Sequence, residues 1–583
     1  MTILVFEPPF IEPGLPRPEV FRLAALLRGH GADARVVDAN LLVYQGLLGD
    51  ARSGSLSEVP EATLRDAFCE AFFVTKSDLQ RAIDGDCSRA GDMSPEVLAA
   101  LRERDISRLT PALQSVSERF SGKGIFTSHQ QYVADQELMN AALDAQMRAL
   151  APRGGWQLWL SRVESAMVVA EPEGVLEIAS DRGGPVAKLL DRHVRSALTS
   201  DSVQAALVVI GQESQLVGGL ALAAWLWREY SIRATATGWH LLQVLQQHWP
   251  RALHEVVPEI AVHPLDCCVR EWLGHDDHPY VRCSPPPTFP SLDLAEVPQG
   301  TRRAARMSGC VVEQNSEAYL SPLPITGAIA TSRCYWSRCA FCGIAATRAL
   351  PLRHLPAEDI VSAFDRLAAS GVHHLQFFDY ALPPRLLQEL AEAGDRGVCW
   401  CGQARFEPAF LRPGFFNRLA QAGCVGISWG FETASPRLLE RIGKGGVVEP
   451  HQRAAILRNS TRAGLQNYLF AIVGLPGETE HEFLESAGWI ADNAENIAGL
   501  EPYAYQLHAR TAFDEQRKRW GLEVGAGASG WLLNFPFSSP ISAAEVRWRL
   551  DVLSSLAKQI AICRRTHDWM EGHLTLGRAL GVW

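Results

Sequence analysis

The chain lacks a hydrophobic run long enough to cross a bilayer. Its longest apolar stretch, Leu216 to Trp227, ends in Arg228-Glu229 and is shorter than the roughly 20 residues that a transmembrane helix needs. The N-terminal residues also lack the basic start and the small-residue cleavage site of a signal peptide. We therefore expect a cytoplasmic protein that has no membrane partner.

Long basic tracts, internal repeats and low-complexity segments are also missing. The 583 residues carry a formal net charge of -10, which argues against nucleic acid as a partner. Hydrophobic residues make up 47% and charged residues 21%, as in globular proteins, and the length predicts two or three domains. The 13 cysteines are an odd number, so in a reducing compartment they indicate thiols or metal ligands rather than a disulfide framework.

Residues 1–290 are predicted to form an α/β domain around an open parallel sheet. Apolar runs predict strands at 2–6, 33–37, 205–210, 232–237 and 259–262, and helical periodicity predicts helices at 19–28, at 215–229 and from Leu241. Residues 42–200 are polar and rich in Ala and Glu, which indicates a helical insertion. Open parallel sheets bind ligands past the carboxyl ends of their strands, so we expect a ligand site there.

A second α/β series follows a proline-rich linker at 281–300. The predicted strands are 325–331, 373–379, 398–404, 424–431, 466–473 and 500–507, and the predicted helices are 357–370, 384–394, 413–422, 435–442 and 480–493. Six strand and helix units in succession favour a partial or closed barrel of parallel strands over 291–515. Residues 516–583 are expected to form a small helical domain that caps the substrate, with a helix near 543–564.

Three cysteines stand at the spacing C-x4-C-x2-C just after the first strand of this series: Cys334, Cys339 and Cys342. A loop this tight can turn three thiolates toward one point, and cysteine thiolates hold iron–sulfur clusters. The alternative is zinc, but structural zinc sites use four ligands, usually as two separated pairs. Since no second CxxC lies nearby, the spacing favours a cluster with one open position.

The loop and its place after the first strand resemble the cluster-binding loop of the radical S-adenosylmethionine (SAM) family. That family usually has C-x3-C-x2-C, so the first gap of this chain is one residue longer. The aromatic Phe341 before the last cysteine fits the family pattern. The resemblance implies a [4Fe–4S] cluster held by the three cysteines, with SAM bound to the fourth iron.

Segments at later strand ends agree with the same resemblance. They are Phe377 to Pro383, Gly402 to Glu407, Gly426 to Pro436 and Ile472 to Thr479. The resemblance implies SAM contacts at Asp379, Arg405, Glu432, Thr433, Ser435 and Gly474. Each of these also has a purely structural reading: a helix cap, an ion pair or a turn. Separate structural roles do not explain why these residues follow one another at successive strand ends. That end of the strands is the catalytic face of β/α barrels.

The first domain resembles the cobalamin-binding domain that precedes the barrel in one radical SAM subclass. The resemblance rests on the strand-end segments Glu7-Pro-Pro, Val37 to Asn40, Val208 to Gln212 and Thr237 to His240. It implies cobalamin contacts at Pro8, Gln212, Glu213, Ser214, Gly238 and Trp239. The Asp-x-His-x-x-Gly motif for an axial histidine is absent, which is neutral because many members of the subclass lack that ligand. The alternative is a flavodoxin-like domain that has lost its ligand or binds another one.

Taken together, the predicted fold is α/β: a doubly wound, Rossmann-like cobalamin-binding domain, a partial (β/α)6 radical SAM barrel of the TIM type, a helical insertion and a small C-terminal domain. The resemblance implies a C-methyltransferase that uses a [4Fe–4S] cluster, SAM and methylcobalamin on a natural product or ribosomal peptide. An external electron donor of the flavodoxin or ferredoxin kind is implied as well. Two alternatives stay open: a cobalamin radical enzyme that rearranges, cyclises or oxidises its substrate, and a non-catalytic cobalamin- or metal-binding protein.

Overall fold

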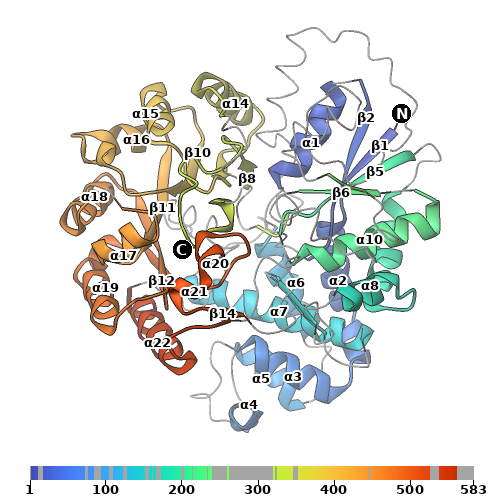
Figure 1. Cartoon of the computed structure of the whole chain (residues 1–583). Helices are drawn as coiled ribbons and strands as arrows, with labels where there is room; N and C mark the ends of the chain where they lie inside the picture. Colours follow the sequence, from blue (N-terminus) through green and yellow to red (C-terminus); the bar gives the residue numbers. More distant parts are fainter. Residues whose placement is uncertain are drawn as a thin grey trace.

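The structure of the chain is a computed structural model. It describes residues 2–10, 13, 17–29, 31–72, 76–84, 93–103, 109–121, 126, 128–151, 156–160, 162–165, 172–198, 203–212, 214–232, 234–238, 259–261, 319–321, 323, 325–345, 352, 354–445, 448–524 and 537–560. Two parallel sheets lie side by side in Figure 1, one in each half of the chain. The expected linker at 281–300 and the expected helix from Leu241 lie outside the described residues. No described helix is long and apolar enough to span a membrane.

The N-terminal sheet has five parallel strands in the order β2-β1-β5-β6-β7. The strands are β1 (Thr2–Glu7), β2 (Asp33–Asp38), β5 (Val203–Val209), β6 (Ala234–Thr237) and β7 (Glu259–Ala261). Counting only these strands, the order is 2-1-3-4-5, which is a doubly wound arrangement with its switch point between β1 and β5. The predicted Rossmann-like fold is confirmed in this respect.

Helices α1 (Pro18–Gly29) and α10 (Gln215–Tyr230) cover the two faces of this sheet. Successive side chains of a strand point to opposite faces, so β1 contributes to two cores at once. Ile3 and Val5 pack with α1 in one buried cluster, whereas Leu4 and Phe6 pack with α10 in another. The continuous apolar sequence of β1 is therefore explained by burial on both faces.

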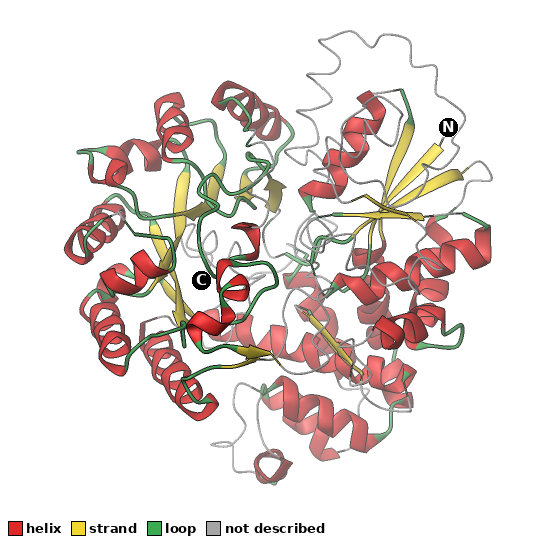
Figure 2. Cartoon of the chain, in the orientation of Figure 1, coloured by secondary structure: helices red, strands yellow, loops and turns green. Residues whose placement is uncertain are grey.

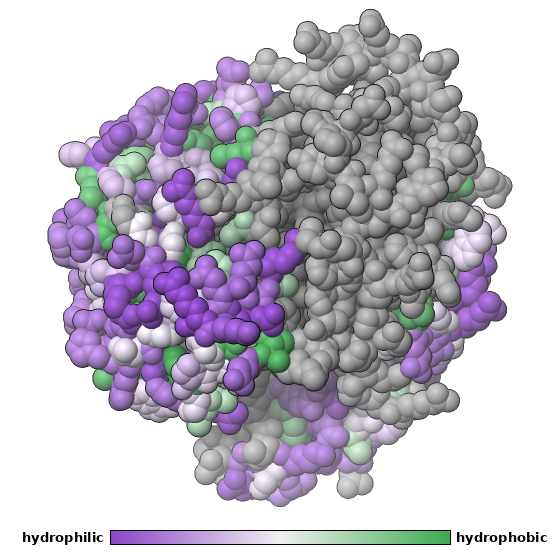
Figure 3. Space-filling model, in the orientation of Figure 1, coloured by the Kyte–Doolittle hydropathy of each residue, from purple (hydrophilic) through white to green (hydrophobic). Residues whose placement is uncertain are grey.

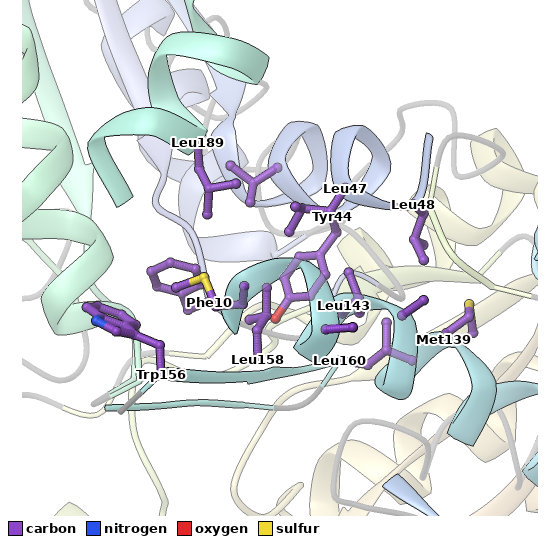
Figure 4. Packing of buried hydrophobic residues seen from close by; sticks show 14 of the residues in the cluster. Phe10, Tyr44, Leu47, Leu48, Met139, Leu143, Trp156, Leu158, Leu160 and Leu189 are labelled. Atoms are coloured by element: carbon purple, nitrogen blue, oxygen red, sulfur yellow. The ribbon is translucent and has the colours of Figure 1, made fainter. Parts of the chain in front are cut away.

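The connection from β2 to β5 is a large, mostly helical insertion, as predicted. Its helices are α2 (Ala39–Arg52), η1 (Ser55–Glu58), α3 (Glu61–Ala71), α4 (Lys76–Ile83), α5 (Pro95–Glu103), α6 (Leu109–Arg119), α7 (His129–Leu150), α8 (Pro172–Ser180), α9 (Pro185–Leu189), η4 (Leu190–Val194) and η5 (Arg195–Ala197). A hairpin of β3 (Trp156–Trp159) and β4 (Arg162–Ser165), which we did not expect, packs on α7. Figure 4 shows Tyr44 and Phe10 packed among apolar side chains of the insertion. The Tyr44 hydroxyl donates to the Trp159 carbonyl at 2.9 Å.

The second half contains six parallel strands in strict sequence order, from β8 at one edge to β13 at the other. Figure 2 shows the strands of this half in yellow, with helices around them. They are β8 (Ile325–Ala328), β9 (His374–Phe377), β10 (Cys399–Ala404), β11 (Cys424–Glu432), β12 (Gln466–Val473) and β13 (Gly499–Ala504). Because no pairing between β8 and β13 is found in the described part, the barrel is open, as the predicted partial (β/α)6 barrel requires.

Helices cover the outer face of these strands. They are α14 (Ala357–Ala369), α15 (Pro384–Ala393), η10 (Pro408–Leu411), α16 (Phe415–Gln421), α17 (Pro436–Arg441), α18 (Pro450–Arg462), α19 (Glu480–Asp492), η11 (Ala494–Asn496) and α22 (Ala543–Ile560). We did not predict α18, although its capping box of Glu449 and Gln452 is a sequence signal for a helix start. The last helix, α22, packs on β13 and α19 and places Leu553 in the barrel core.

Three short elements lie between β13 and α22. They are α20 (Ala512–Glu515), α21 (Arg517–Trp520) and the ribbon of β14 (Glu523–Val524) with β15 (Phe537–Ser538). The substrate-capping domain that we expected over 516–583 is described only in part, because residues 561–583 lie outside the described residues. Its described helix α22 is a member of the outer layer of the barrel.

The carboxyl edge of the N-terminal sheet contacts the barrel near β8 and β9. The Tyr319 hydroxyl donates to Asp38, at the end of β2, at 2.7 Å. The Leu320 amide donates to the Pro13 carbonyl at 3.0 Å. The Arg17 guanidinium lies 4.8 Å from the centre of the Phe378 ring, which directly follows β9. The strand ends of the two sheets therefore approach one another at this junction.

Candidate functional site

The cysteine loop leaves the carboxyl end of β8 and makes one sharp turn at Ser337. Ser337 has a φ of 45°, in the left-handed region that few residues other than glycine adopt. Its hydroxyl donates to the Cys334 carbonyl at 2.6 Å, and Arg333 Nη1 donates to the same carbonyl at 2.9 Å. The four-residue gap between Cys334 and Cys339 is thus taken up by a hydrogen-bonded turn, so the extra residue does not displace the loop from the strand end.

Two contacts anchor the loop to the end of α17. The Ala340 amide donates to the Ile442 carbonyl at 2.8 Å, and Trp336 Nε1 donates to the Gly443 carbonyl at 2.8 Å. Gly443 has a φ of 72°, and a side chain there would overlap the Arg338 carbonyl. Only glycine allows the loop to approach α17 this closely.

The three thiols lie close enough for their charges to interact. Burial raises the pKa of Cys339 to about 11 and that of Cys342 to about 12, with a further rise at Cys342 from the charge of Cys339. No three His, Cys, Asp or Glu side chains in the described part converge into a finished metal site. Thiolates are the ligands that an iron–sulfur cluster uses, and its positive iron would offset the burial that now keeps the thiols protonated. In donor type and loop position, these residues fit such a cluster.

Asp379, which we expected to bind SAM, braces the start of the cysteine loop. The side chain is 2% exposed, and its carboxylate accepts hydrogen bonds from the amides of Ala330 and Thr331 at 2.8 and 2.6 Å. The Thr331 hydroxyl donates to it as well, at 2.5 Å. Burial outweighs these donors and raises the pKa of Asp379 to about 6. The carboxylate therefore orients the backbone that leads to Cys334.

Arg405, at the end of β10, lies directly against the cysteine loop. Its guanidinium carbon is 3.6 Å from the centre of the Trp336 ring, and the residue is 4% exposed. Nη1 is 3.2 Å from Glu407 Oε1, yet none of the three guanidinium nitrogens donates a hydrogen bond within the described residues. A buried guanidinium with unused donors is costly unless a ligand supplies the acceptor, and a carboxylate matches its fork geometry.

Glu432 ends β11 in a strained conformation next to the cysteine loop. Its φ is 58°, and the pairing of β11 with β12 shifts between Gly430 and Glu432. Its carboxylate forms a buried ion pair with Lys444, which also donates to the Gly430 carbonyl at 3.1 Å. Backbone strain of this kind is found at functional sites where the surrounding structure enforces it.

Thr433 and Ser435, two further predicted SAM contacts, use their hydroxyls inside the protein. The Thr433 hydroxyl lies 3.0 Å from that of Ser486. The Ser435 hydroxyl accepts from the Leu438 amide at 3.2 Å as the cap of α17 and donates to Glu482 at 2.6 Å. Both residues are buried and their hydroxyls make hydrogen bonds within the protein, so the role of each in SAM binding stays a prediction.

Gly474, the last predicted SAM contact, forms the turn after β12. It has a φ of 77°, and its amide donates to Glu478 Oε2 at 2.7 Å. Glu478 also forms a buried ion pair with Arg549 of α22 at 2.6 Å, and both side chains are 1% exposed. The turn is therefore tied to the last helix of the barrel.

The structure brings together a smaller set than the sequence predicted. The charges of Lys444, Glu432 and Arg405 all act on the Cys339 thiol, so these groups surround the cysteine loop. Trp336 and Lys444 belong to this set, although we did not predict them as site residues. A lysine twelve residues after a strand-end glutamate is too weak a sequence signal to identify the pair. The group formed by the cysteine loop, Arg405, Glu432 and Lys444 is called the loop site below.

The predicted cobalamin contacts that the structure describes lie at the carboxyl edge of the N-terminal sheet. Some of their polar groups make hydrogen bonds within the protein and others do not. Gln215 closes the space between β1 and β5: its side chain donates to Glu7 and to the Pro8 carbonyl and accepts from the Gln212 amide. The Ser214 hydroxyl is buried and has no hydrogen-bond partner within the described residues. Gly238 has a φ of 124° and lies against the backbone of Ile210. Glu213 and Trp239 lie outside the described residues.

Comparison with known proteins finds a family match for a segment of the barrel. Residues 329–490, which contain the three cysteines and β9 to β12, match the Radical SAM superfamily. The chain therefore carries a radical SAM domain.

The chain is also 27% identical over 182 residues to the ribosomal protein uS12 methylthiotransferase RimO of Pelotomaculum thermopropionicum (29% of this chain, 40% of the relative). It is 28% identical over 241 residues to RimO of Acidothermus cellulolyticus (39% of this chain, 45% of the relative). The matches thus span less than half the length of these relatives. Among solved structures, the radical SAM methyltransferase TsrM of Kitasatospora setae, with cobalamin and a [4Fe–4S] cluster bound, is 15% identical with a TM-score of 0.44 and covers 66% of this chain and 82% of that chain.

Proposed function

We propose that this protein is a radical SAM enzyme whose loop site binds SAM next to a [4Fe–4S] cluster. Cys334, Cys339 and Cys342 would hold the cluster. The observation that carries the proposal is Arg405, a buried guanidinium stacked on Trp336 of the cysteine loop with unused hydrogen-bond donors. When bound, the cluster supplies the electron that cleaves SAM to a 5′-deoxyadenosyl radical.

The residues of the loop site divide the binding of SAM among them. Arg405 binds the carboxylate, because its planar fork makes two parallel hydrogen bonds to that group. Glu432, held in place by Lys444, accepts hydrogen bonds from the amino group or the ribose hydroxyls. Asp379 acts through the loop backbone and makes no direct contact with SAM. Thr433 and Ser435 are left out, because their hydroxyls are engaged elsewhere.

We further propose that the N-terminal domain binds cobalamin and that the reaction is a methyl transfer to an unactivated carbon of a small molecule or peptide. The doubly wound strand order and the contact between its carboxyl edge and the barrel support a ligand at the junction. The partnerless Ser214 hydroxyl and the exposed Gln212 are the described groups that remain for such a ligand. Gln215 already fills the space between β1 and β5, so the ligand would lie beside that space.

Anaerobic purification with an iron count, a cobalamin spectrum and mass spectrometry of adenosine products tests these proposals separately. Release of 5′-deoxyadenosine from SAM supports radical chemistry, and S-adenosylhomocysteine supports methyl transfer. The Cys339→Ala variant is expected to lose the cluster and SAM cleavage together. The control Cys424→Ala removes a buried thiol on β11, outside the cysteine loop, and is expected to retain both. Retained iron and turnover in Cys339→Ala would refute the assignment of the cluster.

Methylthio transfer is the second candidate, and the two RimO relatives favour it. A methylthio product contains the substrate, a methyl group and one added sulfur, whereas a methyl product contains no new sulfur. High-resolution mass spectrometry of the product therefore separates the two reactions. Because the matched segments cover less than half of each relative, their substrate is not carried over to this chain.

A further inference from the structure

A basic pocket lies on the outer side of the cysteine loop. It has a volume of about 380 Å³ and is open to solvent. Its walls come from the loop, from α17 and from α20 and α21, and the lining residues are Ala340, Arg437, Glu440, Arg441, Ala512, Phe513, Gln516, Arg519 and Trp520. Figure 3 shows hydrophilic side chains gathered on this face of the barrel. This group of residues is called the arginine pocket below.

The cysteine loop itself forms one wall of the arginine pocket. Ala340 stands between Cys339 and Cys342 and is held on both sides: its amide donates to the Ile442 carbonyl at 2.8 Å, and its carbonyl accepts from the Phe513 amide at 3.2 Å. Cys339 is 8% exposed. A molecule seated in the pocket therefore contacts the residue that directly follows Cys339.

The charge in the arginine pocket is not balanced by the residues that line it. Three arginines stand against one glutamate, in a chain whose net charge is -10. Burial lowers the pKa of Arg441, and the positive charges of Arg437 and Arg519 lower it further, although the charge of Glu482 raises it in part. Glu482, just outside the pocket, pairs with Arg437. Guanidinium groups that lie close together repel one another, and a negatively charged partner reduces this repulsion.

The pocket also has the aromatic and arginine chemistry of a binding surface. The guanidinium carbons of Arg441 and Arg519 lie 4.8 and 5.1 Å from the centre of the Trp520 ring. Trp and Arg are the residues that most often contribute binding energy at protein interfaces. Lys518 and Arg519 are exposed, so they are accessible to a partner.

We propose that the arginine pocket is the docking surface for an acidic one-electron donor protein, a reduced flavoprotein or iron–sulfur protein. The donor would lose one electron, and a cluster held by Cys334, Cys339 and Cys342 would gain it; no covalent bond would form or break at the docking surface. The inference rests on the proposed function, because it requires a cluster on Cys334, Cys339 and Cys342. Opposite charge would steer the donor to this surface, which the cysteine loop lines through Ala340.

The test uses a bacterial flavodoxin as the acidic probe and the full-length protein with its cluster reconstituted. Arg519→Glu reverses a charge whose only described hydrogen bond goes to Gln516. Arg385→Glu on α15 is the matched control, since it makes the same charge change on an exposed helix that is not part of the pocket. The dissociation constant is measured by calorimetry at low and high salt, and cluster reduction is followed by stopped-flow absorbance.

Arg519→Glu is expected to weaken flavodoxin binding on the order of tenfold and to slow cluster reduction by flavodoxin by a similar factor. Cluster reduction by titanium(III) citrate should stay unchanged, and high salt should remove the difference between the variant and the control. An equal loss in Arg385→Glu, salt-independent binding, or tight binding of RNA at the pocket in place of flavodoxin would overturn the proposal. Failure of the proposed function looks different, since no cluster spectrum would form with any reductant.

Discussion

Arg405 allows the sharpest test of the loop site, because a structural role and a ligand-binding role predict different effects on stability and on SAM affinity. If Arg405 is structural, its buried contact with Glu407 contributes to folding, and Arg405→Met should destabilise the protein by about 3–5 kcal/mol. If it binds a ligand, the ligand-free protein already bears the cost of unused buried donors, about 1–3 kcal/mol. Removal of the guanidinium would relieve that cost.

The magnitude for the binding reading follows from the contacts. The stacking on Trp336 that Arg405→Met loses contributes about 0.5–2 kcal/mol, so it offsets most of the relieved cost. The free energy of unfolding should therefore change by less than about 2 kcal/mol. The affinity for SAM should fall by about 2 kcal/mol or more, which is on the order of 30-fold in Kd.

Calorimetry of SAM binding to the reconstituted protein, paired with chemical denaturation, measures both quantities. Arg405→Lys keeps the charge but loses the planar fork, so its affinity should be intermediate. Arg412→Met, which removes an exposed arginine bonded to Gln388, is the control and should leave both quantities unchanged. Unchanged SAM affinity together with a loss of about 3–5 kcal/mol in Arg405→Met, as expected when a buried ion pair is broken, would refute the ligand role.

Three further predictions test the surrounding structure. Gly443→Ala should lower the iron content of the reconstituted protein, because the new side chain overlaps the Arg338 carbonyl. The control is Gly371, which has a similar φ of 78° and open space around it. Gly371→Ala should lower the free energy of unfolding by about 1–2 kcal/mol without loss of iron. Burial raises the pKa of Asp379 to about 6, so the stability from its extra proton is fully present below about pH 4 and is lost as pH rises through about 6. In urea unfolding, the wild type should lose up to about 3 kcal/mol of unfolding free energy relative to Asp379→Asn across this pH range. A difference that does not depend on pH would contradict the assignment. Arg549→Met leaves Glu478 as an uncompensated buried charge and should lower the free energy of unfolding by about 3–5 kcal/mol. The control Arg547→Met, on the same helix, should change that free energy by less than about 0.5 kcal/mol. Equal effects of the two variants would show that the buried ion pair does not stabilise the protein.

The periodicity of the sequence was enough to place every strand of the barrel. Strands buried on both faces read as short apolar runs, and the helices between them end at glycines such as Gly371, so the predicted bounds agree with the structure within a few residues. The helix α18 was missed because its mean composition is polar and only a few of its residues face the core. The hairpin of β3 and β4 was missed because its strands are only four residues long.

The site was harder to predict than the fold, and a comparison of two positions shows why. Ser435 and Arg405 both follow a strand with a motif that resembles a SAM contact. The structure gives the Ser435 hydroxyl two protein partners and gives the Arg405 guanidinium no hydrogen bond in the described part. Whether a polar side chain is already satisfied depends on residues far away in sequence, such as Glu482, 47 positions from Ser435.

The sequence by itself determined the chemistry that is available: three thiols in one short loop, at the carboxyl end of the first of six strands. Local spacing is enough for that, because three cysteines within nine residues of one loop must lie close together in space. Only the tertiary structure decided which charges surround the loop and which of its sides faces solvent. Lys444 reaches Glu432 and Arg405 reaches Trp336 through the meeting of three strand ends, and Ala340 lines the arginine pocket because α20 and α21 pack beside it. Those contacts arise from the packing of distant segments, which sequence spacing does not encode.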